Sequence, residues 1–210
     1  MRPKVVSFDM DGTLTQPSFA DEVWHECLPK LRAEKMGISL DEARRLCERE
    51  YDEVGDQRRE WYDLGYWIKR FGLEVKREEI FLKCADKVRL YPEVREVLEK
   101  LHRQYQLIIY TNAPRDFAEF QLKTAGIADL FQRIYSSLDD FGEVKRKESF
   151  SSILSELGIS AQQMVHVGDH PIFDFEVPRS LNIRAYLIDR EGKLQGEHII
   201  HNLLELEDKL

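Results

Sequence analysis

The chain has 210 residues, of which 42 % are hydrophobic, and a formal net charge of -8. This length and composition can supply one sizeable core, which excludes a disordered chain. The acidic balance argues against nucleic acid or an anionic membrane surface as a partner, and no apolar run is long enough for a membrane span. The widely spaced cysteines, Cys27, Cys47 and Cys84, predict reduced thiols in a cytoplasmic protein.

The first predicted element is a short buried strand that runs directly into two acidic residues. Val5–Phe8 is apolar apart from Ser7, and Asp9, Asp11 and Gly12 come soon after it. A carboxylate at the edge of a core must be solvated, paired with a cation or bound to a metal. Because Asp-Gly is also a common turn signal, this stretch alone leaves an ordinary turn and a functional site both open.

The next part of the chain, residues 16–89, shows helical periodicity and no convincing strand. The pattern predicts helices over 20–36, 39–54, 61–71 and 77–86, and a capping box at the start of the second. We interpret residues 16–89 as a helical cap subdomain inserted after the first strand; a helical hairpin packed rigidly on the sheet is the alternative. The aromatic residues at 61, 62, 66 and 67 fit either a buried stripe or a surface that contacts a substrate.

Strands and helices alternate through the rest of the chain. The predicted strands are Leu107–Tyr110, Arg133–Ser136, Met164–Val167 and Ala185–Ile188, alternating with helices over 92–101, 116–125, 148–157 and 175–181. This alternation predicts an α/β fold with a Rossmann-like, mostly parallel sheet and helices on both faces. Residues 1–15 and 90–210 are expected to form this core domain, and the apolar tail at 199–206 to dock as a helix.

Polar residues stand directly behind several of these strands. In parallel α/β sheets, ligands gather outside the carboxyl ends of the strands. The residues found there, or just before the helix at 148–157, are Thr111, Asn112, Lys145, Gly168, Asp169 and Asp174. Each one has an ordinary explanation as a cap, a turn or a solvated charge. Together with Asp9 and Asp11, they place four acids, a lysine and a hydroxyl around one crevice.

These motifs resemble, in order and spacing, those of the haloacid dehalogenase superfamily, whose members are mostly magnesium-dependent phosphatases. The resemblance covers nearly the whole chain and rests on FDMDGTL at 8–14, Thr111-Asn112, Lys145 and GDHPIFD at 168–174. The helical insert matches a type of cap that the family places between its first and second motifs. The third motif commonly has a proline after its lysine; this chain has Arg146 there, so Lys145 and Lys147 both stay candidates for the motif lysine.

The resemblance implies a phosphoryl transfer in two steps. Asp9 would attack phosphorus and form an aspartyl-phosphate, and Asp11 would serve as general acid and then as general base. Mg²⁺ would be held by the Asp9 carboxylate, the Asp11 backbone carbonyl and Asp169. The acid at position 11 favours a phosphatase over a dehalogenase, because dehalogenating relatives do not keep an acid there.

The resemblance also implies roles for the residues around these acids. Lys145 would be catalytic and would bind the phosphoryl oxygens together with Thr111 and Asn112. The residues expected to support the metal ligands from behind are Gly168, His170 and Asp174.

The expected substrate is a small phosphorylated metabolite, with the cap acting as a lid over the crevice. Arg115, just past the second motif, is a candidate substrate contact, although a surface arginine at a helix start fits the same position. The expected activity is magnesium-dependent hydrolysis of a small organic phosphate monoester. A phosphomutase or other phosphotransferase on the same core, and a non-catalytic binding module, are the alternatives. The sequence does not decide between a monomer and a dimer.

Overall fold

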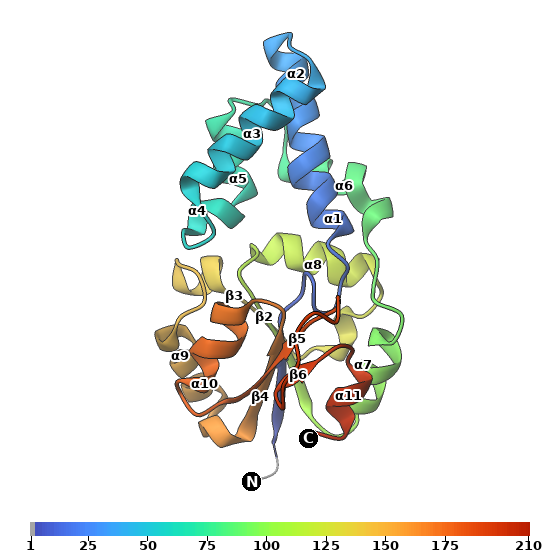
Figure 1. Cartoon of the computed structure of the whole chain (residues 1–210), viewed down its shortest axis with the longest axis vertical. Helices are drawn as coiled ribbons and strands as arrows, with labels where there is room; N and C mark the ends of the chain where they lie inside the picture. The colour runs from blue at the N-terminus through green and yellow to red at the C-terminus, as the bar shows by residue number, and fades with distance from the viewer. Residues whose placement is uncertain (1–2) are drawn as a thin grey trace. The chain divides into compact units, whose positions relative to one another are not determined.

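The structure, a computed structural model, describes residues 3–210 and divides into two compact units. One unit comprises the chain up to Gln16 together with Leu90–Leu210, and the other comprises Pro17–Arg89. We call them the α/β unit and the helical unit (Figure 1). Among residues 3–210, every helix is too short or too polar to cross a lipid bilayer.

A six-stranded sheet with the order β3-β2-β1-β4-β5-β6 forms the centre of the α/β unit. Its strands are β1 (Val5–Phe8), β2 (Gln106–Thr111), β3 (Arg133–Ser136), β4 (Met164–Gly168), β5 (Arg184–Ile188) and β6 (Ile199–Ile200). All neighbouring strands are parallel. The chain order reverses at β1, and in such sheets ligands bind outside the carboxyl ends of the strands at this switch point. The predicted Rossmann-like α/β fold is confirmed.

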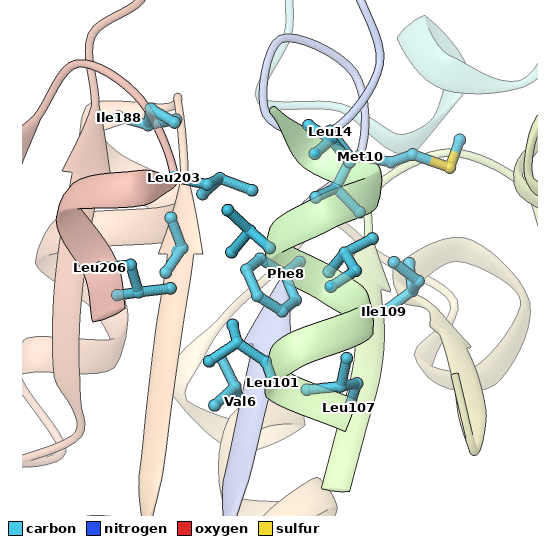
Figure 2. Close-up of a cluster of buried hydrophobic side chains, with 14 of the residues drawn as sticks. Val6, Phe8, Met10, Leu14, Leu101, Leu107, Ile109, Ile188, Leu203 and Leu206 are labelled. Atoms are coloured by element: carbon cyan, nitrogen blue, oxygen red, sulfur yellow. The ribbon is translucent and has the colours of Figure 1, made fainter. Parts of the chain in front are cut away.

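Helices cover both faces of the sheet because side chains along each strand alternate between two cores. Val6 and Phe8 of β1 belong to one hydrophobic cluster, and Val5 belongs to the other. Figure 2 shows the first cluster, where Phe8 lies among Leu101 and Leu107. The α-helices of this unit are α7 (Val94–His102), α8 (Arg115–Thr124), α9 (Lys147–Leu157), α10 (Val177–Arg179) and α11 (Leu204–Glu207). Its 3-10 and π-helical turns are Ala128–Leu130, Ser137–Phe141, Ala161–Gln163 and Pro171–Glu176.

The tail of the chain differs from the prediction. Ile199–Ile200 forms strand β6, which extends the sheet beside β5, and a helix begins only at Leu204. The expectation of one docking helix over 199–206 is therefore wrong. The physical reason is that two adjacent β-branched residues at an open sheet edge gain backbone hydrogen bonds by pairing with β5.

The helical unit contains no strand among its residues, Pro17–Arg89. Its elements are α1 (Ser18–Asp21), the π-helical turn Glu22–Cys27, α2 (Leu28–Met36), α3 (Leu40–Val54), α4 (Arg59–Tyr62), α5 (Leu64–Arg70), α6 (Arg77–Cys84) and the 3-10 turn Ala85–Lys87. Ser39 caps α3, and its Oγ accepts a hydrogen bond from the Glu42 N–H at 3.2 Å, which is one of the two hydrogen bonds of the predicted capping box. The helix predicted over 61–71 is split at Asp63, whose carboxylate instead caps α5 by accepting from the N–H groups of Gly65 and Tyr66.

One member of the aromatic stripe forms the centre of this unit. Trp67 is fully buried, and its ring meets that of Tyr51 edge-on with 4.6 Å between centroids. Trp61, Tyr62 and Tyr66 are only half-buried. The buried-stripe interpretation thus holds for Trp67, and a substrate contact by the other three stays a prediction.

Candidate active site

The loop after β1 turns sharply and brings two acids to the carboxyl end of the sheet. The N–H groups of residues 13–15 all donate to the carbonyl of Met10. Gly12 adopts a φ of 78°, and a Cβ at this position would lie 2.2 Å from Oδ2 of Asp169. Only glycine tolerates both the conformation and the close approach. The turn therefore packs the loop that carries Asp9 and Asp11 directly against Asp169.

Lys145 links the loop after β1 to the segment after β4. Its Nζ lies 2.6 Å from Oδ1 of Asp9 and 2.6 Å from Oδ1 of Asp174. The lysine is 1 % exposed, and its backbone N–H donates to Oδ1 of Asn112 at 2.8 Å. Lys147 is exposed. Of the two candidate lysines, the structure places Lys145 against the acids.

Asp174 is held from several sides. Its Oδ1 also lies 3.0 Å from Nε2 of His166, whose Nδ1 is 2.9 Å from Oγ of Ser7, and its Oδ2 accepts from the His170 N–H. A Cβ on Gly168 would lie 2.3 Å from Cγ of Asp174, so the glycine at the end of β4 makes room for this carboxylate. With Lys145 included, the two oxygens of Asp174 take part in three hydrogen bonds, which fits a carboxylate that orients its neighbours.

The acids differ in how well their charges are compensated. Burial raises the pKa of Asp9 well above its usual range; Lys145 opposes this rise, and Asp174 and Asp169 add to it. Burial and the charge of Asp174 also raise the pKa of Asp169 to about 7, although its side chain still reaches solvent and is partly screened. For Asp174, burial would raise the pKa, but Lys145 and His166 lower it below the usual range. The negative charge of Asp9 and Asp169 is therefore compensated only in part by the protein itself, with Lys145 as the cation beside Asp9.

This cluster has the donor set of a site for a hard cation. Asp9, Asp169 and Asp174 each offer a carboxylate oxygen, and these oxygens lie within 4.8 Å of one another. Opposite ligands of an octahedral Mg²⁺ are separated by about 4 Å, because each Mg–O bond is about 2.0–2.1 Å long. Oxygen ligands suit Mg²⁺, Ca²⁺ or Mn²⁺ better than softer metals. The residues present can bind a divalent ion; ligation by the backbone carbonyl of Asp11 stays a prediction.

Asp11 is oriented by a residue that the sequence did not single out. Its Oδ1 accepts from Nε2 of Gln121 at 3.0 Å and from Oγ1 of Thr15 at 3.3 Å. Gln121 lies on α8 and is fully buried, and its Oε1 finds no hydrogen-bond partner among residues 3–210. The available signal was an amide on the apolar face of the predicted helix, between Ala118 and Leu122.

The remaining candidates make contacts that leave their predicted roles open. Thr111 is 3 % exposed, and its Oγ1 accepts from the Ala113 N–H at 3.1 Å. Arg115 pairs with Asp140 at 2.5 Å, so part of its donor capacity is used within the α/β unit. Nδ1 of His170 accepts from two backbone N–H groups and caps the turn Pro171–Glu176. Substrate binding by Thr111 and Arg115 stays a prediction.

Two further residues that support the site were missed. His166 stands inside an apolar strand, where its position between Val165 and Val167 could have indicated a buried polar role. Arg190 follows β5 in a polar stretch that gives no such signal. Its guanidinium pairs with Glu93, donates to the carbonyl of Thr13 and lies 3.8 Å from the ring centroid of Tyr91. These contacts fix the loop after β1.

Comparison with known proteins identifies the class. The sequence model of the haloacid dehalogenase-like hydrolases matches residues 3–180. The chain belongs to the haloacid dehalogenase-like hydrolase family, and the prediction of a phosphatase-type hydrolase is confirmed.

Individual relatives cover the chain to different extents. The GMP/IMP nucleotidase YrfG of Escherichia coli is 27% identical over 172 residues, which are 78% of this chain and 73% of that protein. Haloacid dehalogenase-like hydrolase domain-containing protein 3 of Danio rerio is 35% identical over 95 residues, which are 42% of this chain and only 39% of that protein. The crystal structure of a HAD phosphatase from Thermococcus onnurineus superimposes with a TM-score of 0.86 at 29% identity and covers 98% of this chain and 97% of that one.

Proposed function

We propose that this chain is a Mg²⁺-dependent phosphatase that hydrolyses a small organic phosphate monoester through an aspartyl-phosphate on Asp9. The observation that carries the proposal is the position of Asp9. Its carboxylate lies 2.6 Å from the buried Lys145 ammonium and within 4.8 Å of carboxylate oxygens of Asp169 and Asp174. The similarity to a GMP/IMP nucleotidase supports a phosphorylated metabolite as the substrate.

We infer the metal ligands from how strongly the protein compensates the charge of each acid. Asp9 and Asp169 would hold Mg²⁺ together with the carbonyl of Asp11, while Asp174 keeps its hydrogen bonds and supports Lys145. When bound, the ion supplies the positive charge that lets a carboxylate approach a phosphate dianion.

Asp9 performs the first step as a nucleophile. Its carboxylate oxygen forms a bond to phosphorus while the bond to the leaving alkoxide breaks. Lys145 stays protonated, because the charges of Asp174 and Asp9 outweigh its burial and raise its pKa above the usual range. Its ammonium compensates charge on the phosphoryl group, and Thr111 and Asn112 contribute polar groups at the end of β2.

Asp11 moves the proton in both steps. It protonates the leaving alkoxide and then accepts a proton from the water that hydrolyses the aspartyl-phosphate. A placed acid–base group contributes about 10²–10⁴-fold to the rate. Gln121 and Thr15 hold the Asp11 carboxylate in one orientation for this task.

The helical unit is assigned the role of a cap. We propose that residues 16–89 act as a lid that selects the leaving group and excludes water, with residues 1–15 and 90–210 as the catalytic domain. A cytoplasmic location stays a prediction, and the choice between a monomer and a dimer stays open.

A substrate screen tests the proposed function. The purified chain is incubated with nucleoside monophosphates, sugar phosphates and phosphorylated carboxylic acids, and released inorganic phosphate is measured with Mg²⁺ or with EDTA. We expect release with Mg²⁺, loss in EDTA and recovery when Mg²⁺ is added in excess. Asp9→Asn, purified in the same way, controls for contaminating phosphatases. Release that persists unchanged in EDTA would contradict the proposal, and formation of an isomeric phosphate without release would support the phosphotransferase alternative.

A further inference from the structure

Two of the three cysteines lie together inside the helical unit. Cys27 ends the turn Glu22–Cys27, and Cys84 ends α6. Their thiols are close enough to influence each other, and both line one open pocket of about 920 Å³ within this unit. We propose that Cys27 and Cys84 are a redox pair, which a low-molecular-weight disulfide oxidises to an intramolecular disulfide bond.

The two thiols are suited to different steps. Cys27 is half-buried and can be reached from the pocket, whereas Cys84 is 1 % exposed. The interaction with Cys84 lowers the pKa of Cys27 to about 7. The charges of Lys83 and Lys30 also lower this pKa, whereas burial and the charge of Glu22 raise it. The same interaction and burial raise the pKa of Cys84. Because an external disulfide can reach only the more accessible thiol, Cys27 is the attacking sulfur and the buried Cys84 is the resolving one.

Cys47 is the natural reference thiol. It is fully buried, and its sulfur accepts a hydrogen bond from Arg32 at 3.7 Å. Burial raises the pKa of Cys47, and neither of the other two cysteines is among its partners. It lies outside the pocket that Cys27 and Cys84 share. Cys47 is therefore expected to stay a thiol under conditions that oxidise the pair.

The reaction needs an external disulfide and no other oxidant. The Cys27 thiolate attacks one sulfur of that disulfide, its S–S bond breaks, and one small thiolate leaves and takes up the proton of Cys84. The Cys84 thiolate then attacks the sulfur of Cys27 and forms the Cys27–Cys84 bond, and the second small thiolate leaves and takes up the proton that Cys27 released to water when it became a thiolate. Two protein thiols are oxidised by two electrons, and the external disulfide is reduced to two thiols.

Mass spectrometry tests the pair without any assay of activity. The fully reduced chain is incubated with oxidised glutathione near neutral pH, and the remaining thiols are then blocked with iodoacetamide after the chain is unfolded in urea. We expect a cross-linked peptide pair containing Cys27 and Cys84, a loss of about 2 Da before blocking and one alkylated thiol, at Cys47. Cys47→Ser should show the same loss of mass, and Cys84→Ser should hold glutathione on Cys27. Without oxidant, Cys27 should be alkylated at least about tenfold faster than Cys47.

Each alternative outcome identifies a failure of the proposal. Alkylation of all three thiols after the oxidation step would overturn it. A stable glutathione adduct on Cys27, with Cys84 still a free thiol that iodoacetamide alkylates, would overturn it as well. A disulfide that includes Cys47 would do the same. The wild-type chain and Cys47→Ser give these results even if Cys84→Ser does not fold.

Discussion

The two units treat buried polar groups in opposite ways. Cysteine and aromatic side chains aside, all buried polar and charged side chains among residues 3–210 lie in the α/β unit. There, Lys145 and Asp174 are each 1 % exposed. In the helical unit, charges such as that of Glu50 form ion pairs that keep contact with solvent.

This difference separates the residues that serve chemistry from those that serve folding. Removing a charge from water costs several kcal/mol even when a partner is present. The α/β unit bears this cost at the ends of β1 and β4, where the candidate nucleophile and metal ligands lie. Changes to its charges should therefore affect turnover, whereas changes to charges of the helical unit should affect stability by small amounts.

The largest effect is expected from Asp9→Asn. An amide cannot attack phosphorus as a carboxylate does, so turnover with Mg²⁺ should fall by at least about 10⁴-fold. Steady-state phosphate release measures this loss. Asp52→Asn, at an exposed position of the helical unit, is the matched control and should keep wild-type turnover. A comparable loss of turnover in both variants would contradict the claim that only charges of the α/β unit serve the chemistry.

Lys145→Met should cause the largest loss of stability. It leaves the carboxylates of Asp9 and Asp174 buried without their shared cation, which costs about 3–5 kcal/mol. Urea unfolding in the presence of EDTA measures the change. Lys147→Met, at the exposed neighbouring lysine, should stay within about 0.5 kcal/mol of wild type. A larger cost at position 147 would show that the wrong lysine was assigned.

Gln121→Leu should give a smaller loss that depends on the leaving group. Without the amide, Asp11 loses one of the hydrogen bonds that orient its carboxylate, so hydrolysis of an alkyl phosphate, which needs a proton on the leaving oxygen, should slow about tenfold. An aryl phosphate with an acidic leaving group needs less protonation and should slow less than about threefold. Equal losses for both substrates, with an unchanged KM, would assign Gln121 a purely structural role.

The smallest effect is expected from Glu50→Gln in the helical unit. Burial would raise the pKa of Glu50, but hydrogen bonds from Arg70 and Arg32 lower it below its usual value. A carboxyl whose pKa is lower in the folded state stabilises the fold fully when the pH is above its unfolded-state pKa of about 4.3. This stabilisation is lost as the pH falls through the folded-state pKa. The variant should lose about 0.5–1 kcal/mol at pH 7 and less than that at about pH 3, with turnover unchanged. Urea unfolding at both pH values measures the loss of stability. A larger loss at low pH than at pH 7 would contradict the predicted pH dependence.

The sequence predicted the α/β fold well because strand and helix periods are local signals. The apolar run Val5–Phe8 and the spacing within α7 can be read without knowing the partner segments. The partners of Gln121 and Arg190 could not be predicted in this way, because they lie more than 100 residues away in the chain. The strand β6 was missed for the same reason, since its pairing depends on the free edge of β5.

The central claim is that Asp9 becomes covalently phosphorylated. The most direct measurement is rapid acid quenching of wild-type enzyme during turnover with Mg²⁺, followed by peptide mass spectrometry. The account predicts a gain of about 80 Da on the peptide that contains Asp9, absent from Asp9→Asn and from samples quenched with EDTA already present. A phosphorylated residue other than Asp9, or full turnover by Asp9→Asn, would contradict it.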